Sequence, residues 1–133
     1  MKRFLCALLA VVMLCTMAVS MVSCFASIDS MEKNCKKLKE DGEIVEYHVA
    51  TEAELKMFGE KVVAAISAIG KDELYFSAVE FEDKDSAVKY FEEAEKELKE
   101  MEDAGVNVEK YVLKRDGKIV ISCTDKDLYK KIA

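Results

Sequence analysis

The chain has 133 residues and a formal net charge of −6, from 26 acidic and 20 basic side chains. This balance excludes the usual nucleic-acid-binding proteins, whose affinity depends on lysine and arginine side chains that neutralise phosphates, and we expect no nucleic-acid partner. The length predicts one domain, with no room for two.

The first 23 residues are predicted to form a secretory signal peptide. Lys2 and Arg3 precede an apolar run from Phe4 to Val22 that contains no charged residue. A basic start, an apolar run and small residues at the exit are typical of such signals. We therefore expect the rest of the chain to lie outside the cytoplasm. Removal of the two basic residues would make it more acidic still.

The end of this segment, Met21-Val22-Ser23-Cys24, resembles the lipobox of bacterial lipoproteins, with Met in place of the usual Leu. In that family the cysteine is lipidated and becomes the new N-terminus. The resemblance implies a diacylglycerol on Cys24, a short tether over residues 24–30, and an anchor on the extracytoplasmic side of the cell membrane.

Two alternatives stay open for this segment. The apolar run is just long enough to span a bilayer, so it could remain as an uncleaved membrane anchor. Ordinary cleavage after Ala26 is the other alternative. The lipidated and uncleaved forms have the same topology, because the basic start stays inside and the domain lies outside.

Residues 31–133 are predicted to form a single α+β domain. Helical spacing of apolar residues indicates a first helix over 30–41, and alternation indicates a strand over 43–50. Thr51 begins a capping box that starts the next helix. We interpret residues 52–69 as a short helix over 52–58 and a strand over 62–69, although one long helix is the alternative, because this stretch is rich in alanine.

The sequence patterns in the second half of the domain define its secondary-structure elements more clearly. The aromatic, nearly continuously apolar run from Leu74 to Phe81 predicts a central strand. A long helix follows and ends near Gly105. Asp116-Gly117 favours a hairpin turn between strands over 108–115 and 118–123. Thr124 is expected to cap a short last helix.

The order of these elements predicts a ferredoxin-like plait. Residues 43–115 read β-α-β-β-α-β, with an added N-terminal helix, a C-terminal strand and a short C-terminal helix. In this fold the strands at 43–50 and 74–81 would be the central pair, and two helices would cover one face of an antiparallel sheet.

The open face of that sheet is the predicted interaction surface. It carries either Tyr75, Ser77 and Val79 or the opposite set, Phe76, Ala78 and Glu80. We expect a protein partner or a second copy of the chain to contact this face, because a bare apolar sheet face is unusual in a monomer. The leading hypothesis is a non-enzymatic binding domain without a cofactor.

The sequence offers no recognisable catalytic motif and no metal site. His48 is the only histidine, and no further histidine or cysteine stands near it at ligand spacing. An enzyme with a site that motifs do not reveal is the alternative class. Cys35 and Cys123 could pair as a disulfide outside the cell, but burial as small apolar side chains is the favoured interpretation.

Overall fold

The computed structural model describes residues 27–59 and 61–133, so the predicted signal peptide and Cys24 lie outside the described residues. The described chain alternates helices and strands in an α+β order, which confirms the predicted class. The elements are α2 (Ile28–Glu40), β1 (Ile44–Val49), α3 (Glu52–Phe58), β2 (Val62–Gly70), a 3₁₀ turn (Lys71–Glu73), β3 (Tyr75–Phe81), α4 (Lys84–Asp103), β4 (Val112–Asp116), β5 (Ile119–Cys123) and α5 (Lys126–Ile132).

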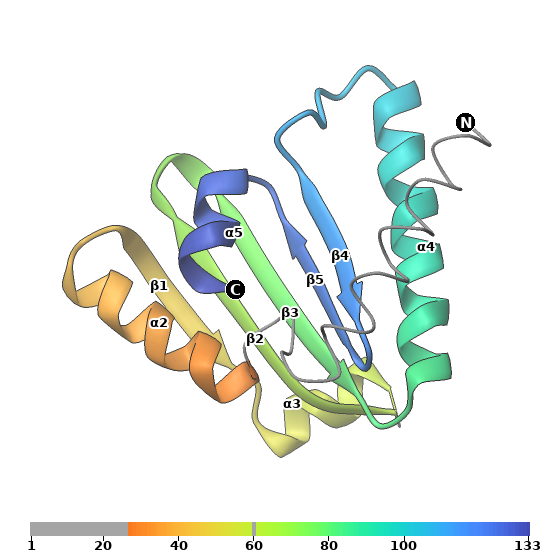
Figure 1. Cartoon of the computed structure of the whole chain (residues 1–133), viewed down its shortest axis with the longest axis horizontal. Coiled ribbons are helices and arrows are strands. Elements are labelled where there is room, and N and C mark those ends of the chain that lie inside the picture. Colours follow the sequence, from red (N-terminus) through yellow and green to blue (C-terminus); the bar gives the residue numbers. More distant parts are fainter. Residues whose placement is uncertain (1–26, 60) are drawn as a thin grey trace, which may run out of the picture.

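The five strands form one antiparallel sheet in the order β1-β2-β3-β5-β4 (Figure 1). The split of residues 52–69 into a helix and a strand is confirmed, because α3 ends at Phe58 and β2 begins at Val62. The ferredoxin-like plait is not confirmed. Its central pair, expected at 43–50 and 74–81, is separated by β2, and β1 lies at the edge of the sheet.

The length of α3 explains this difference. In the plait, the first two strands run parallel with the third strand between them, which requires a connection that returns along the length of the sheet. The seven residues of α3 extend about 10 Å, whereas the nine residues of β2 extend about 30 Å. Such a short helix only turns the chain, so β2 runs back beside β1 as its antiparallel partner.

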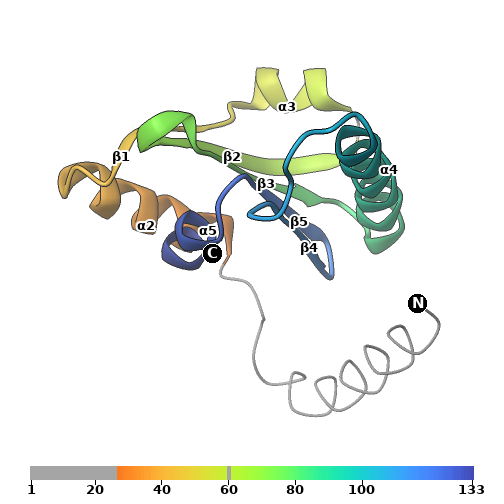
Figure 2. The ribbon, with the colours of Figure 1, turned by 90° about the horizontal axis from the view of Figure 1, so that it is seen from above.

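One face of the sheet is covered by α2 and α5, which lie together on the same side in Figure 2. The main core lies between these helices and the sheet. It contains Met31 and Cys35 from α2, Phe76 from β3 and Ile132 from α5, all without solvent exposure. The Asn34 side chain also donates a hydrogen bond to the Ile132 carbonyl at 2.9 Å, joining the two helices.

The other face of the sheet carries α3 and α4, which lie apart from each other (Figures 1 and 2). A smaller core there consists of Ala65, Val79, Phe81, Ala87 and Val120. Within the described residues, α4 contributes only Ala87 as a fully buried residue, and α3 contributes none. This α3/α4 face is therefore the less completely covered side of the sheet.

Two helix starts differ from the sequence predictions. Ser27 caps α2, and Ile28 is already buried, so residues 28–30 belong to the domain and not to the tether. Asp125, rather than Thr124, caps α5, and its carboxylate accepts hydrogen bonds from two backbone N–H groups. The Thr124 hydroxyl instead accepts a hydrogen bond from the Tyr75 N–H at 2.8 Å and joins β5 to β3. The capping box that starts at Thr51 is present.

Candidate functional site

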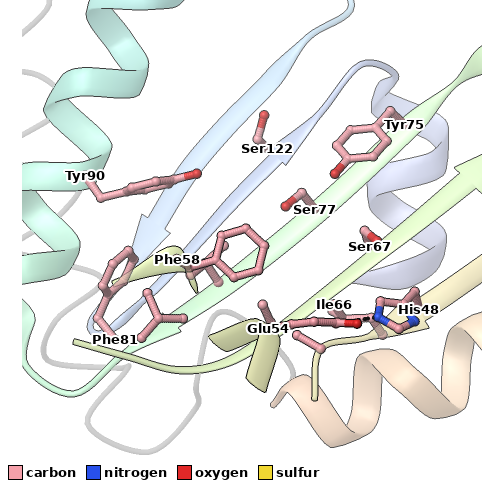
Figure 3. Close-up of a pocket in the computed structure, with 14 residues that line it drawn as sticks. His48, Glu54, Phe58, Ile66, Ser67, Tyr75, Ser77, Phe81, Tyr90 and Ser122 are labelled. Carbon is pink, nitrogen blue, oxygen red and sulfur yellow. Dashed lines mark hydrogen bonds and ion pairs between the residues drawn. The ribbon is translucent and has the colours of Figure 1, made fainter. Parts of the chain in front are cut away.

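A hollow of about 330 Å³ lies on the α3/α4 face of the sheet (Figure 3). We call it the groove. Strands β1, β2, β3 and β5 form its floor, α3 borders it at Glu54 and Phe58, and α4 borders it at Tyr90. The volume is at the small end of the range for ligand pockets, which is roughly 300–1,000 Å³.

A row of polar side chains crosses the floor of the groove. The strand register places His48 opposite Ser67, Ser67 opposite Ser77, and Ser77 opposite Ser122. Neighbouring strands are about 4.8 Å apart, and residues directly opposite one another share a face of the sheet. The three serines, which we call the serine row, therefore form a line across β2, β3 and β5 (Figure 3).

The hydroxyl groups of the serine row are available to a ligand. Within residues 27–59 and 61–133, no protein group is hydrogen-bonded to the side chains of Ser67, Ser77 or Ser122. Ser67 and Ser77 are half-buried and Ser122 is exposed. Because each hydroxyl can donate one hydrogen bond and accept others, the floor presents both donors and acceptors.

Aromatic rings border this polar row. Phe58, Tyr75 and Tyr90 are 65%, 45% and 42% exposed, respectively, and all three line the groove. The Tyr90 ring packs against Phe81 with a centroid distance of 5.2 Å, which fixes its position beside β3. Burial on that side raises the pKa of Tyr90, so its hydroxyl remains neutral at physiological pH. The groove thus combines apolar rings with neutral polar groups.

A histidine and a carboxylate meet at the β1 end of the groove. His48 Nε2 lies 2.6 Å from Glu54 Oε2. The capping box positions Glu54, because its carboxylate also accepts the Thr51 N–H at 3.2 Å. The hydrogen bond from His48, followed by that from Thr51, lowers the pKa of Glu54. Glu54 is therefore ionised at neutral pH and can hold the His48 ring in one orientation.

The residues predicted for the interaction face divide clearly between the two sides of the sheet. Tyr75, Ser77 and Val79 all line the groove. In the opposite set, Phe76 and Ala78 are completely buried under the α2/α5 side, and Glu80 is half-buried.

His48, Ser67 and Ser122 also belong to this surface and were not predicted from the sequence. A signal for the serines exists, because Ser67 and Ser122 are each the single hydroxyl-bearing residue of an otherwise apolar strand. Nothing local places them beside Ser77, since their alignment depends on the register of three strands.

The two cysteines of the domain lie in the main core, away from the groove. Cys35 and Cys123 are both buried, and both thiols are free in this structure. Burial raises the pKa of Cys35 to about 11, with a further contribution from Glu32. Burial also raises the pKa of Cys123, whose thiol donates to the Asp125 carbonyl at 3.1 Å. Neutral, buried thiols of this kind are poor nucleophiles.

No cluster of three metal-ligating side chains occurs in the described part of the chain. None of the described helices is long and apolar enough to cross a membrane. Comparison of the sequence with protein-family models, with curated proteins and with solved structures found no match.

Proposed function

We propose that the protein is a lipid-anchored binding domain on the extracytoplasmic side of a bacterial cell membrane, and that it binds its ligand or partner through the groove without catalysing a reaction. The composition of the groove is the observation that supports the binding role. It combines exposed aromatic rings with serine hydroxyl groups that have no partner among residues 27–59 and 61–133. A few polar groups among apolar side chains are typical of ligand sites.

Two observations support the anchored arrangement: the sequence before Cys24 and the position at which α2 begins. The basic start, apolar run and lipobox-like residues indicate lipidation at Cys24. The first helix of the described domain, α2, begins at Ile28, and four residues of fully extended chain span at most about 14 Å. A lipid on Cys24 would therefore hold the domain close to the bilayer surface.

Labelling with a radioactive fatty acid tests the anchor. Wild-type protein should incorporate the label, and the Cys24→Ala variant should not. The mass of the mature protein separates the alternatives, because an uncleaved anchor keeps residues 1–23 and ordinary cleavage after Ala26 removes Cys24. Absence of label from wild type, with the protein found in the cytoplasm, would overturn the anchored proposal.

Envelope capture with matched variants tests the groove. The Ser77→Tyr variant fills the groove, whereas Ser30→Tyr adds the same side chain to α2 on the opposite side of the sheet. A component that is retained by wild type and by Ser30→Tyr but lost with Ser77→Tyr would support binding through the groove. Equal retention by all three proteins would overturn it. Light scattering reveals whether the partner is a second copy.

A hydrolase is the second candidate, and the contact between His48 and Glu54 is the observation that favours it. A carboxylate that orients a histidine beside a serine is the arrangement of nucleophilic hydrolases, and Ser67 lies opposite His48. However, no hydrogen bond joins Ser67 to His48 in the described structure. Hydrolysis of a chromogenic ester that is abolished by both Ser67→Ala and His48→Gln would establish this alternative.

A further inference from the structure

We propose that the ligand of the groove is a neutral carbohydrate, bound as one or two sugar rings with their faces against the aromatic side chains and their hydroxyls on the serine row. This inference rests on the proposed binding role of the groove and specifies its ligand class. It follows from the charge, the hydrogen-bonding groups and the rings that line the groove.

The charges at the groove favour a neutral ligand. Among the described lining residues, Glu54 is the only carboxylate, and its Oε2 lies 2.6 Å from His48 Nε2, which satisfies it within the protein. In the part of the chain that the structure describes, no lysine or arginine lines the groove to bind a phosphate or carboxylate. The net charge of −6 also repels anions. A cationic ligand would need an unpaired carboxylate, and Glu54 is already paired with His48.

The serine row suits a molecule with several hydroxyl groups. Ser67, Ser77 and Ser122 follow one another on adjacent strands, so the row extends over about 10 Å at a strand spacing of about 4.8 Å. Each hydroxyl acts as donor and acceptor, as does each hydroxyl of a sugar. A purely apolar ligand would instead remove these three groups from water without replacing their hydrogen bonds, which is unfavourable.

The rings of Tyr75, Tyr90 and Phe58 supply the complementary apolar contacts. The face of a pyranose ring presents C–H groups, which pack against the face of an aromatic side chain. Tyrosine also carries a hydroxyl, so its ring can pack against the sugar while the hydroxyl forms a hydrogen bond with the same ligand. All three rings are partly exposed although they border a hollow, so they can contact a ligand without a change in the core.

A second hollow extends the groove and gives room for more than one ring. It has a volume of about 160 Å³ and lies between α4 and the β4–β5 hairpin. Tyr90 and Ser122 line both hollows, which are therefore adjacent. Tyr111 and Met101 border the far part. A chain of two or three sugars could follow this path from β3 towards α4.

Nuclear magnetic resonance titration of the ¹⁵N-labelled domain tests this inference. A chain of residues 25–133 is suitable, because every member of both cores lies between Ile28 and Ile132. The probes are N-acetylglucosamine, its β-1,4-linked trimer and maltotriose, with inorganic phosphate as the charged comparison. Co-sedimentation with insoluble chitin and cellulose distinguishes a polymer ligand from a free sugar.

We expect at least one sugar, and not phosphate, to shift the amide signals of Ser67, Ser77 and Ser122 with a dissociation constant of about 1 mM or tighter. Ser77→Ala should weaken binding about fivefold, because it removes one hydrogen bond. Tyr75→Ala should weaken it about tenfold by removing an aromatic contact. Ser30→Ala, on the opposite side of the sheet, should leave the affinity unchanged.

The inference is overturned if no sugar shifts these signals at tens of millimolar, or if the shifts persist unchanged in Ser77→Ala and Tyr75→Ala. It is also overturned if the groove binds an apolar dye but no carbohydrate. If no sugar binds but capture from the envelope still depends on the groove, only the carbohydrate inference is overturned and the proposed binding role stands. If capture does not depend on the groove either, both the carbohydrate inference and the proposed binding role are overturned.

Discussion

Tyr75 and Phe76 are neighbours in β3, yet their side chains lie on opposite faces of the sheet. Tyr75 is 45% exposed and lines the groove, whereas Phe76 has no solvent exposure and lies in the main core. This alternation follows from the two-residue repeat of a strand. It divides β3 into one set of side chains that stabilises the fold and another that is free to bind.

The first prediction compares these two residues. Phe76→Ala should lower the free energy of unfolding by about 3–5 kcal/mol, because it leaves a cavity in a closed core. Tyr75→Ala should cost far less, since its ring already contacts solvent. Urea denaturation measures both. If Phe76→Ala does not fold, Phe76→Leu should still destabilise more than Tyr75→Leu. Equal effects at the two positions would contradict the assignment of the faces.

The second prediction concerns the link between α2 and α5. Asn34→Ala removes the hydrogen bond to the Ile132 carbonyl and should lower the free energy of unfolding by about 1 kcal/mol. Hydrogen exchange should show faster opening of α5, whereas β2 and β3 keep their protection. Asn107→Ala removes a side chain that accepts a hydrogen bond from the Glu109 N–H in the same loop and serves as the control. Unchanged exchange in α5 would show that this link does not hold the helix.

The third prediction is a dependence on pH at the start of α4. The backbone N–H of Ser86, then its side chain, lowers the pKa of Asp83 below its ordinary value of 3.8. The N–H donates to Asp83 Oδ1 at 2.7 Å. Because the pKa of Asp83 is lower in the folded protein, its ionised carboxylate contributes its full stabilisation at pH values above the ordinary pKa of 3.8. This stabilisation is lost as the pH falls through the lower pKa of the folded protein.

Asp83→Ala should therefore reduce the melting temperature by about 5 °C at pH 7. The difference from wild type should shrink as the pH is lowered below about 4. Asp83→Asn keeps a capping side chain that does not titrate in this range, so its melting temperature should exceed that of Asp83→Ala at pH 7. Thermal unfolding followed by circular dichroism from pH 2 to pH 7 measures all three proteins. A constant difference over this range would contradict the role of the carboxylate.

The fourth prediction concerns the two thiols of the core. Because burial raises the pKa of Cys35 to about 11 and also raises that of Cys123, both should react slowly with a thiol reagent at pH 8 in the folded protein. Both should react fully in urea. The Cys35→Ala variant should show one reactive thiol fewer after unfolding. Failure of the unfolded chain to react without a reductant would instead reveal the disulfide that the sequence left open.

Local patterns were sufficient to predict most elements of the domain. The capping box at Thr51 and the absence of charge in residues 62–69 each depend on neighbours in the chain, and both predictions agree with the structure. The predicted hairpin is also present, but its two turn residues are Gly117 and Lys118, because Asp116 is the last residue of β4 and pairs with Ile119. The neighbours of the first strand were predicted wrongly, whereas β2 does pair with β3 and β4 with β5. Apolar strands can be central in several orders, and here the short α3 places β1 beside β2 at the edge, while β5 lies beside β3.

The candidate site was less predictable for the same physical reason. The run from Leu74 to Phe81 is apolar on both faces, so its pattern did not show whether Tyr75 or Phe76 points into a core. His48 has Glu46 two residues away on its own strand, yet its partner is Glu54 on the next helix. Such contacts depend on tertiary packing, which composition and spacing do not specify.

The two edge strands of the sheet, β1 and β4, influence whether crowded copies of the protein aggregate. The pairing of β1 with β2 is irregular between Ile44 and Glu46, and β4 carries Lys114, Arg115 and Asp116 along its length. Irregular or charged borders discourage the addition of a further strand from a neighbouring molecule. Even densely packed copies should therefore resist polymerising into fibrils, and each should keep its groove accessible.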